Sequence, residues 1–391
     1  MRSTLEKQKH PAAEHPELAS GTAAFWRMSW KRAIVWAMII FGITNAVLWK
    51  LEKTKQSNDV WRGTGSIDLA VNEFNALPQK PNIVLLGSSL MMFPFWSMDK
   101  GYDPIHVGDI FHHHKSFVFE NDIRKAGGFD DPRVFSFAIF GQMVSDAYIY
   151  VNEFLRKDRA PQYLIYGIAP RDFSDHDLPS PMATNTFKRL VNIENLAPYA
   201  NLYLPGFQDK IDFVMSRLCF FYDHRSRLQQ EFGKLVEQSY IASGVQKPVK
   251  KVDFSKASNF MLFGGMKERW ASSEKEYARR YKDIGEKDLG VQMGFLKKLL
   301  QVARERGVKV ILVNMPLTSA NRNLLPPGFY SRFRNQIGGL ANQPGIKFVD
   351  LGDNPEFTDW DFWDTAHLGP NGGKKVLTHL VPAMRELQQQ K

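Results

Sequence analysis

A serine that directly follows a short apolar run is the first candidate nucleophile in this chain. Residues 82–87 read as a buried strand, and Ser88 and Ser89 come directly after its last glycine, Gly87. The carboxyl end of a parallel strand is where α/β proteins present reactive groups, and a glycine there permits a sharp turn. Ser89 could therefore attack an electrophile while the following backbone N–H groups bind an oxyanion. The alternative is an ordinary strand-to-helix turn with Ser89 as an N-cap.

An aspartate and a histidine near the end of the chain could activate that serine. Asp364 stands three residues before His367, a spacing that lets the carboxylate reach Nδ1 while Nε2 points at the serine. Asp109 and His112 have the same spacing and form a competing pair. The later pair follows the last apolar run and precedes the closing amphipathic segment, among several glycines. We therefore expect Ser89, Asp364 and His367 to form the triad, and the competing pair to lie off the core.

A glycine at the end of another apolar run could complete the oxyanion site. Gly141 ends residues 133–141, and a glycine lets the backbone approach a bound carbonyl closely. Its N–H would be the second oxyanion donor after that of Ser89. A plain turn glycine is the alternative. Together these residues point to acyl transfer through an acyl-serine.

The elements that must position these residues follow a parallel α/β pattern. Helical patterns separate several of the apolar, β-branched runs, which indicates a parallel sheet covered on both faces. The strongest helical stripe precedes the fourth run and ends at Gly307, and a further amphipathic helix closes the chain. The five runs are residues 82–87, 133–141, 162–169, 308–315 and 346–352.

An uncharged run near the start predicts a membrane anchor. Residues 33–49 carry no charge, and at about 1.5 Å per residue they are a short but adequate span. Trp30 and Trp49 lie at the ends, where indole rings prefer the interface. We expect the N-terminus to be cytoplasmic and the large C-terminal part to be periplasmic or otherwise extracytoplasmic. A buried core helix and a cleaved signal peptide are the alternatives.

These features predict the organisation of the whole chain. The parts are a flexible tail at 1–30, a transmembrane anchor at 31–51, a linker at 52–80, an α/β catalytic domain at 81–175 and 287–391, and a mostly helical insertion at 176–286.

Composition narrows the classes of partner. Of the 391 residues, 43% are hydrophobic and 24% are charged, which are globular values. The net charge of +10 favours anionic partners such as lipid head groups or acidic glycans. The chain shows no nucleic-acid-binding motif, so we expect no nucleic acid partner. The lone cysteine, Cys219, excludes an internal disulfide and a thiolate cluster, and the run His112–His114 is more typical of a solvated loop than of a metal site.

In their order along the chain, these motifs resemble the SGNH/GDSL hydrolase superfamily. The resemblance rests on Gly-x-Ser-Leu after the first run, on Gly141 after the second, and on Asp-x-x-His before the last helix. Ser88 stands where the family usually has Asp. Residues 167–172 stand where it has Gly-x-Asn-Asp, so the Asn that donates a third oxyanion hydrogen bond is missing.

A single N-terminal helix, a degenerate third motif and a large insertion are similar to one branch of that superfamily. This is the membrane-anchored DltD-like and alginate O-acetyltransferase-like branch, whose members work beside membrane-bound O-acyltransferase (MBOAT) channels. The resemblance implies a three-layer α/β/α fold and a cofactor-free serine O-acyltransferase or esterase. Its substrate would be an extracytoplasmic polysaccharide or cell-envelope glycan, and its partners an MBOAT protein and membrane lipid. The alternative is a non-catalytic accessory subunit that binds the glycan or the transferase.

Three further residues are candidates for the site. Arg171 could supply the missing oxyanion donor, or it could form a structural pair with Asp172. Trp360 and Trp363 could stack on sugar rings, and core packing is the alternative.

Overall fold

The computed structural model describes residues 20–58, 64–127, 129, 131–243 and 265–389. Its centre is a five-stranded, wholly parallel sheet with the strand order β2-β1-β3-β4-β5. The predicted α/β fold class is confirmed, and each strand lies within one of the five apolar runs. The strands are β1 (Ile83–Leu86), β2 (Val134–Ser136), β3 (Tyr163–Ile168), β4 (Lys309–Asn314) and β5 (Ile346–Asp350).

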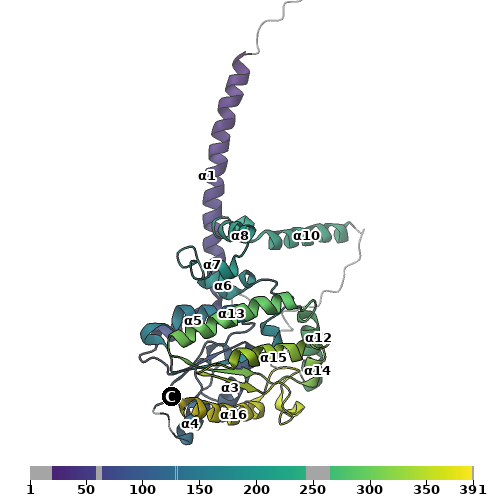
Figure 1. The fold of residues 1–391 in the computed structure, drawn as a ribbon. Helices are drawn as coiled ribbons and strands as arrows, with labels where there is room; N and C mark the ends of the chain where they lie inside the picture. The colour runs from purple at the N-terminus through teal and green to yellow at the C-terminus, as the bar shows by residue number, and fades with distance from the viewer. Residues whose placement is uncertain (1–19, 59–63, 128, 130, 244–264, 390–391) are drawn as a thin grey trace, which may run out of the picture.

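Helices cover both faces of the sheet and make a three-layer α/β/α sandwich (Figure 1). α5 (Val144–Phe154) packs with α13 (Glu286–Glu305) on one side. α3 (Ser89–Tyr102), α4 (Phe117–Ala126) and α16 (Pro370–Gln389) pack together on the other. Because both faces are covered, β1 and β3 are buried along their whole length, which explains their continuous apolar runs.

The predicted helical stripes are the buried faces of α13 and α16. The side chains of both stripes are almost fully buried and join one continuous core with the strands. For α13 they are Leu289, Phe295, Leu296, Leu299, Leu300 and Ala303, and for α16 they are Val376, Leu377, Leu380, Met384 and Leu387.

The strand register brings the candidate residues to one edge of the sheet. Ile83 of β1 pairs with Val134 of β2 and with Tyr163 of β3, so the three strands begin level and run in the same direction. Chain segments that leave their carboxyl ends therefore emerge together.

The described residues of 176–286 are mostly helical, as expected. The described helices are α6 (Asn185–Leu190), α7 (Ala200–Tyr203), α8 (Phe207–Leu218), α9 (Phe220–Asp223), α10 (Arg225–Ala242) and α12 (Met266–Arg280). The first part of this segment shares the core of the sandwich, because the ring of Tyr203 lies 4.5 Å from that of Phe295 in α13. α10 projects from the body, and α12 returns to it (Figure 1).

The N-terminal helix is longer than the predicted anchor. α1 runs from Ser20 to Asn58, and its part Trp30–Lys55 is long and apolar enough to cross a membrane, with a mean hydropathy of 1.8 and none of that window buried. The helix continues past residue 51 because residues 52–58 contain no Pro or Gly and because Lys55 suits the negative end of its dipole. Most of the predicted tail, residues 1–19, lies outside the described residues.

The predicted linker at 52–80 also contains a helix of its own. α2 (Gly65–Ala76) buries Ile67, Ala70 and Phe74, and the Phe74 ring packs 4.8 Å from that of Phe137. Three buried apolar residues at helical spacing, together with the partly buried Leu69 and Val71, dock this part of the predicted linker on the core.

Candidate active site

The structure brings Ser89, His367 and Asp364 into one hydrogen-bonded chain. The Oγ atom of Ser89 lies 2.8 Å from Nε2 of His367 across 278 residues of sequence. Nδ1 of the same ring lies 2.7 Å from Oδ2 of Asp364. The competing histidine lies elsewhere, since His112 is exposed and contacts Asp109.

The turn before Ser89 depends on a glycine. Gly87 has φ +144°, and a Cβ on it would lie 2.7 Å from the carbonyl oxygen of Gly167, so another residue would be strained there. The Gly87 N–H donates to Oε1 of Gln142 at 2.9 Å, and Nε2 of Gln142 donates to the Phe137 carbonyl at 2.8 Å. This amide side chain ties the end of β1 to the loop after β2 and holds Ser89 at the first position of α3.

A closed loop holds Asp364 and His367. Phe362 and Leu368 form an isolated antiparallel bridge, and the Trp363 N–H donates to the His367 carbonyl at 2.7 Å. Within the loop, Oδ1 of Asp364 accepts from the N–H groups of Ala366 at 2.8 Å and His367 at 2.9 Å. The aspartate therefore fixes both the backbone and the imidazole of the histidine.

The electrostatics of the pair favour a charged carboxylate. Burial alone would raise the pKa of Asp364, but the His367 imidazole and the two amide hydrogen bonds lower it below its usual value. An ionised Asp364 accepts the Nδ1–H of His367. Nε2 then carries a lone pair toward Ser89, which is the arrangement that a general base needs.

Apolar rings shield the imidazole and leave the serine reachable. The rings of Phe93 and Tyr277 lie 4.6 and 6.5 Å from that of His367. His367 is 3% exposed and Asp364 4%, whereas Ser89 is only half-buried. A reactant would therefore meet the hydroxyl group before the base.

Two backbone N–H groups near the serine have no acceptor. Within the described part of the chain, neither the N–H of Ser89 nor that of Gly141 donates to a protein oxygen. Gly141 has φ +72°, a left-handed conformation that other residues rarely adopt. Ser89 also begins a fourteen-residue helix, whose dipole favours negative charge at that end. The oxyanion role expected of Gly141 stays a prediction.

Arg171 lies beside Gly141 and makes the expected pair with Asp172, but its shorter contacts are with Asp175. Its Nε and Nη2 atoms lie 3.0 and 2.8 Å from Oδ2 of Asp175, whereas its Nη1 is 3.4 Å from Asp172. The Nη2 atom would lie 3.2 Å from a Cβ placed on Gly141. The guanidinium is thus held by Asp175 and lies close to Gly141, in the candidate oxyanion site. Its role as an oxyanion donor stays a prediction.

A buried ion network surrounds that arginine. Oδ2 of Asp175 also accepts from Nη1 of Arg280 in α12, at 2.6 Å. Burial opposes ionisation of Asp175, but Arg171 and Arg280 together lower its pKa. In contrast, burial raises the pKa of Asp172 to about 6 despite the nearby Arg171 and Ser88. The network fastens α12 over the carboxyl end of the sheet.

The two candidate sugar-stacking tryptophans differ in exposure. Trp360 is 83% exposed, whereas Trp363 is half-buried with the Arg269 guanidinium 5.4 Å above its ring. Only Trp360 offers a free ring face, and its stacking role stays a prediction.

The three consecutive histidines have separate partners. Nδ1 of His112 lies 2.9 Å from Asp109, Nε2 of His113 lies 2.8 Å from Asp99, and Nδ1 of His114 lies 2.9 Å from the Ser136 carbonyl. Among the described residues, no group of three or more His, Cys, Asp or Glu side chains is placed to hold a metal ion.

Sequence reasoning missed three contributors to the site, namely Gln142, Tyr277 and the Asp175–Arg280 pair. Gln142 could have been noticed, because a buried amide beside Gly141 must find hydrogen-bond partners. The other two depend on α12, whose position no local pattern reveals.

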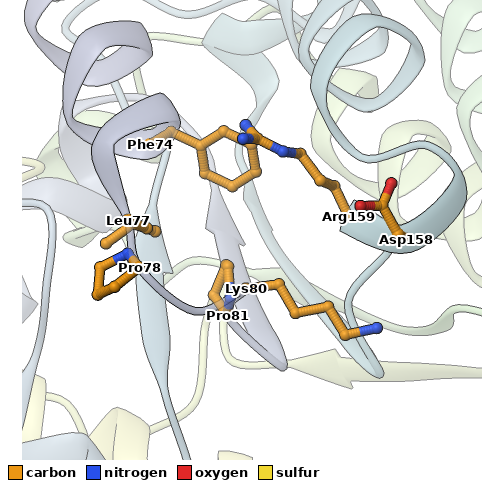
Figure 2. A pocket seen from close by; sticks show the side chains of 7 residues that line it. All are labelled: Phe74, Leu77, Pro78, Lys80, Pro81, Asp158 and Arg159. Carbon is orange, nitrogen blue, oxygen red and sulfur yellow. The ribbon is translucent and has the colours of Figure 1, made fainter.

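A pocket of about 360 Å³ lies at the opposite edge of the sheet (Figure 2). Pro81 precedes β1 and Arg159 precedes β3, so the pocket faces the amino ends of the strands, whereas Ser89 follows the carboxyl end of β1. Figure 2 shows the Arg159 side chain over the Phe74 ring, at 5.2 Å from its centre. This pocket is separate from the triad.

Comparison with known proteins gives no information on the function of the site beyond its geometry. No family model and no curated protein matches the chain. One solved structure that it resembles is a Bacteroides fragilis protein provisionally named an acylhydrolase, with 12% sequence identity and a TM-score of 0.33. The likeness covers 81% of this chain and 93% of that one. So distant a likeness supports no functional inference, and the candidate site depends on its own contacts.

Proposed function

We propose that this chain is a membrane-anchored serine acyltransferase or esterase of the SGNH type, and that Ser89 carries the acyl group. The observation that supports this most is the hydrogen-bonded chain from Ser89 through His367 to Asp364. A hydroxyl 2.8 Å from an imidazole that a buried carboxylate orients is the arrangement of an activated nucleophile.

In the first half of the reaction, Ser89 Oγ attacks the carbonyl carbon of an acyl donor. The hydroxyl proton passes to Nε2 of His367, and Asp364 stabilises the imidazolium that forms. The N–H groups of Ser89 and Gly141 bind the negative oxygen of the tetrahedral intermediate, each contributing roughly 3 kcal/mol. The bond to the donor's leaving oxygen then breaks, and that oxygen takes the proton from His367.

In the second half, an acceptor hydroxyl attacks the acyl-serine. The acceptor gives its proton to Nε2 of His367. The bond between the acyl carbon and Ser89 Oγ then breaks, and Oγ takes that proton from His367. A sugar hydroxyl as acceptor gives acyl transfer, and water gives hydrolysis. The usual third oxyanion donor is missing from the sequence, which costs about 10²- to 10³-fold for a small ester in water. A bound sugar hydroxyl compensates by proximity, so transfer is the favoured outcome.

The proposed substrate is an extracytoplasmic polysaccharide and the proposed acyl group is acetyl. The exposed apolar part of α1 supports a membrane anchor. The proposed location of the catalytic domain is the periplasmic side. The exposed Trp360 supports sugar binding near the triad loop, because flat aromatic faces stack on sugar rings. The DltD-like resemblance supports an MBOAT protein as the acyl donor.

The test of the chemistry is labelling of the full chain with a fluorophosphonate probe. We expect covalent labelling of the wild type, and none after Ser89→Ala or His367→Ala. His112→Ala is the matched control, because that exposed histidine belongs to the competing pair and should leave labelling unchanged.

The test in cells is the acyl content of the envelope polysaccharide. Ser89→Ala should abolish acylation without lowering the amount of protein in the membrane. If acylation stays normal in that variant while deletion of the gene removes it, the chain is a non-catalytic accessory subunit. Absence of probe labelling in the wild type would lead to the same conclusion.

A further inference from the structure

Two helices of the inserted segment expose apolar side chains along one face. The residues recur at the i, i+4, i+7 spacing of a single helical stripe and are 37% to 79% exposed. In α8 they are Phe207, Ile211, Val214, Met215 and Leu218, and in α10 they are Leu228, Phe232, Leu235 and Val236. Exposed apolar stripes of this extent mark a surface that contacts something other than water.

The same segment packs directly on the apolar part of α1. The ring of Phe221 lies 5.7 Å from that of Phe41, and the ring of Phe220 lies 5.9 Å from that of Trp49. Phe41 precedes Lys50, the first charge after the uncharged run, by nine residues. At 1.5 Å per residue, the α8–α9 corner therefore reaches about 13 Å along the uncharged run. If α1 crosses a bilayer, the corner enters it.

A polar residue within the uncharged run is satisfied by this corner. Nδ2 of Asn45 donates to the Leu218 carbonyl at 2.8 Å, and its Oδ1 accepts from the Phe220 N–H at 2.6 Å. These two backbone groups lie at the end of α8 and the start of α9, where helices leave groups unpaired. Unpaired groups are very costly in hydrocarbon but cheap in water. Asn45, the one amide side chain of the run, thus pairs two backbone groups of the corner that would otherwise be unpaired in lipid.

The direction of α10 fits the surface of the same membrane. Figure 1 shows α10 running across the direction of α1, at the level of α8. A helix that crosses the direction of a membrane span lies along the bilayer plane. Amphipathic helices in that orientation place their apolar face at the boundary between head groups and acyl chains.

We propose that the α8–α9 corner and the apolar stripe of α10 lie in the outer half of the membrane that α1 crosses, with lipid as their partner. The inference rests on the anchored topology of the proposed function. It adds a second attachment, which holds the catalytic domain against the bilayer at two places.

The test uses the full chain in phosphatidylcholine vesicles that contain a lipid with a spin label on its acyl chain. With the only cysteine replaced (Cys219→Ser), single cysteines carry a bimane fluorophore at three positions in turn. Ile40→Cys reports on α1, Phe232→Cys on the apolar stripe of α10, and Lys234→Cys on its opposite side, about 200° around the helix from Phe232. Iodide in the buffer is the aqueous quencher.

We expect the spin-labelled lipid to quench the Ile40 and Phe232 positions several-fold more than the Lys234 position, and iodide to show the reverse order. Quenching at Ile40 with equal quenching at Phe232 and Lys234 would keep the anchor and overturn the lipid-bound α10. Protection of Phe232 from both quenchers would overturn it too, since protein would then cover the stripe. No lipid quenching at Ile40 would overturn the anchor and this inference together.

Discussion

Replacing Asp364 by asparagine should reverse the proton arrangement of His367 while keeping its position. In the wild type, Oδ1 of Asp364 accepts two backbone N–H groups, and Oδ2 faces Nδ1 of the histidine at 2.7 Å. The asparagine oxygen must take the place of Oδ1, because an NH₂ group there would face two N–H donors. The NH₂ group then faces Nδ1, which must accept, so the imidazole proton moves to Nε2.

With its proton on Nε2, His367 donates to Ser89 and cannot deprotonate it. The corresponding change in serine proteases lowers the rate about 10⁴-fold, or about 5 kcal/mol of barrier at 1.36 kcal/mol per tenfold. The assay is the second-order rate of fluorophosphonate labelling. Asp109→Asn is the matched control, since Asp109 makes the same contact with His112 on the exposed surface. A rate for Asp364→Asn within tenfold of the wild type would refute the reasoning.

Three further predictions concern the surroundings of the triad. Gly141→Ala should lower the free energy of unfolding by about 1–2 kcal/mol in chemical denaturation, because φ is +72° there and the Cβ would meet Arg171 at 3.2 Å. Asp175→Ala should cost about 2–3 kcal/mol in the same measurement, since it removes the carboxylate that Arg171 and Arg280 share while Arg171 keeps Asp172 and Arg280 keeps Glu276. The folded-state pKa of Asp172 is about 6, above its unfolded value, so its contribution to stability grows as pH falls from about 6 to about 4. Asp172→Asn should flatten the melting temperature over that pH range, and an unchanged pH profile would contradict the assignment.

The strands could be predicted from the sequence because burial on both faces leaves a strong local signal. Each apolar run contains one strand. The order of the motifs along the chain was enough to predict that Ser89 and His367 lie close together, and Ser89 Oγ lies 2.8 Å from Nε2 of His367. The Asp364–His367 contact was predictable for another reason, namely that it forms within one short loop. The apolar runs and the Asp364–His367 loop are local features of the sequence. The meeting of Ser89 with His367 follows once the strands are taken to be parallel.

The rest of the site depends on contacts that no local pattern encodes. Arg280 reaches Asp175 across 105 residues, and this contact adds to the expected pair between Arg171 and Asp172, which is present at 3.4 Å. α2 was not predicted, although Ile67, Ala70 and Phe74 are buried and Leu69 and Val71 pack partly buried against the core. The length of α1 could not be inferred from hydropathy, because the helix ends at Asn58 whereas its uncharged apolar run ends at Trp49.

The contact between an aspartate and the histidine three residues later occurs three times in the part of the chain that the structure describes. Asp103 with His106 and Asp109 with His112 place a carboxylate oxygen 2.9 Å from Nδ1, nearly as Asp364 with His367 does at 2.7 Å. The pKa of all three aspartates is lowered. This acid–imidazole unit is therefore easy to form, and the two exposed copies differ from the triad in having no serine hydroxyl group at Nε2. For protein engineering, the difficult step toward a new serine hydrolase is the placement of the nucleophile and its oxyanion donors. The surface pairs of this protein offer two starting points at which that step could be attempted.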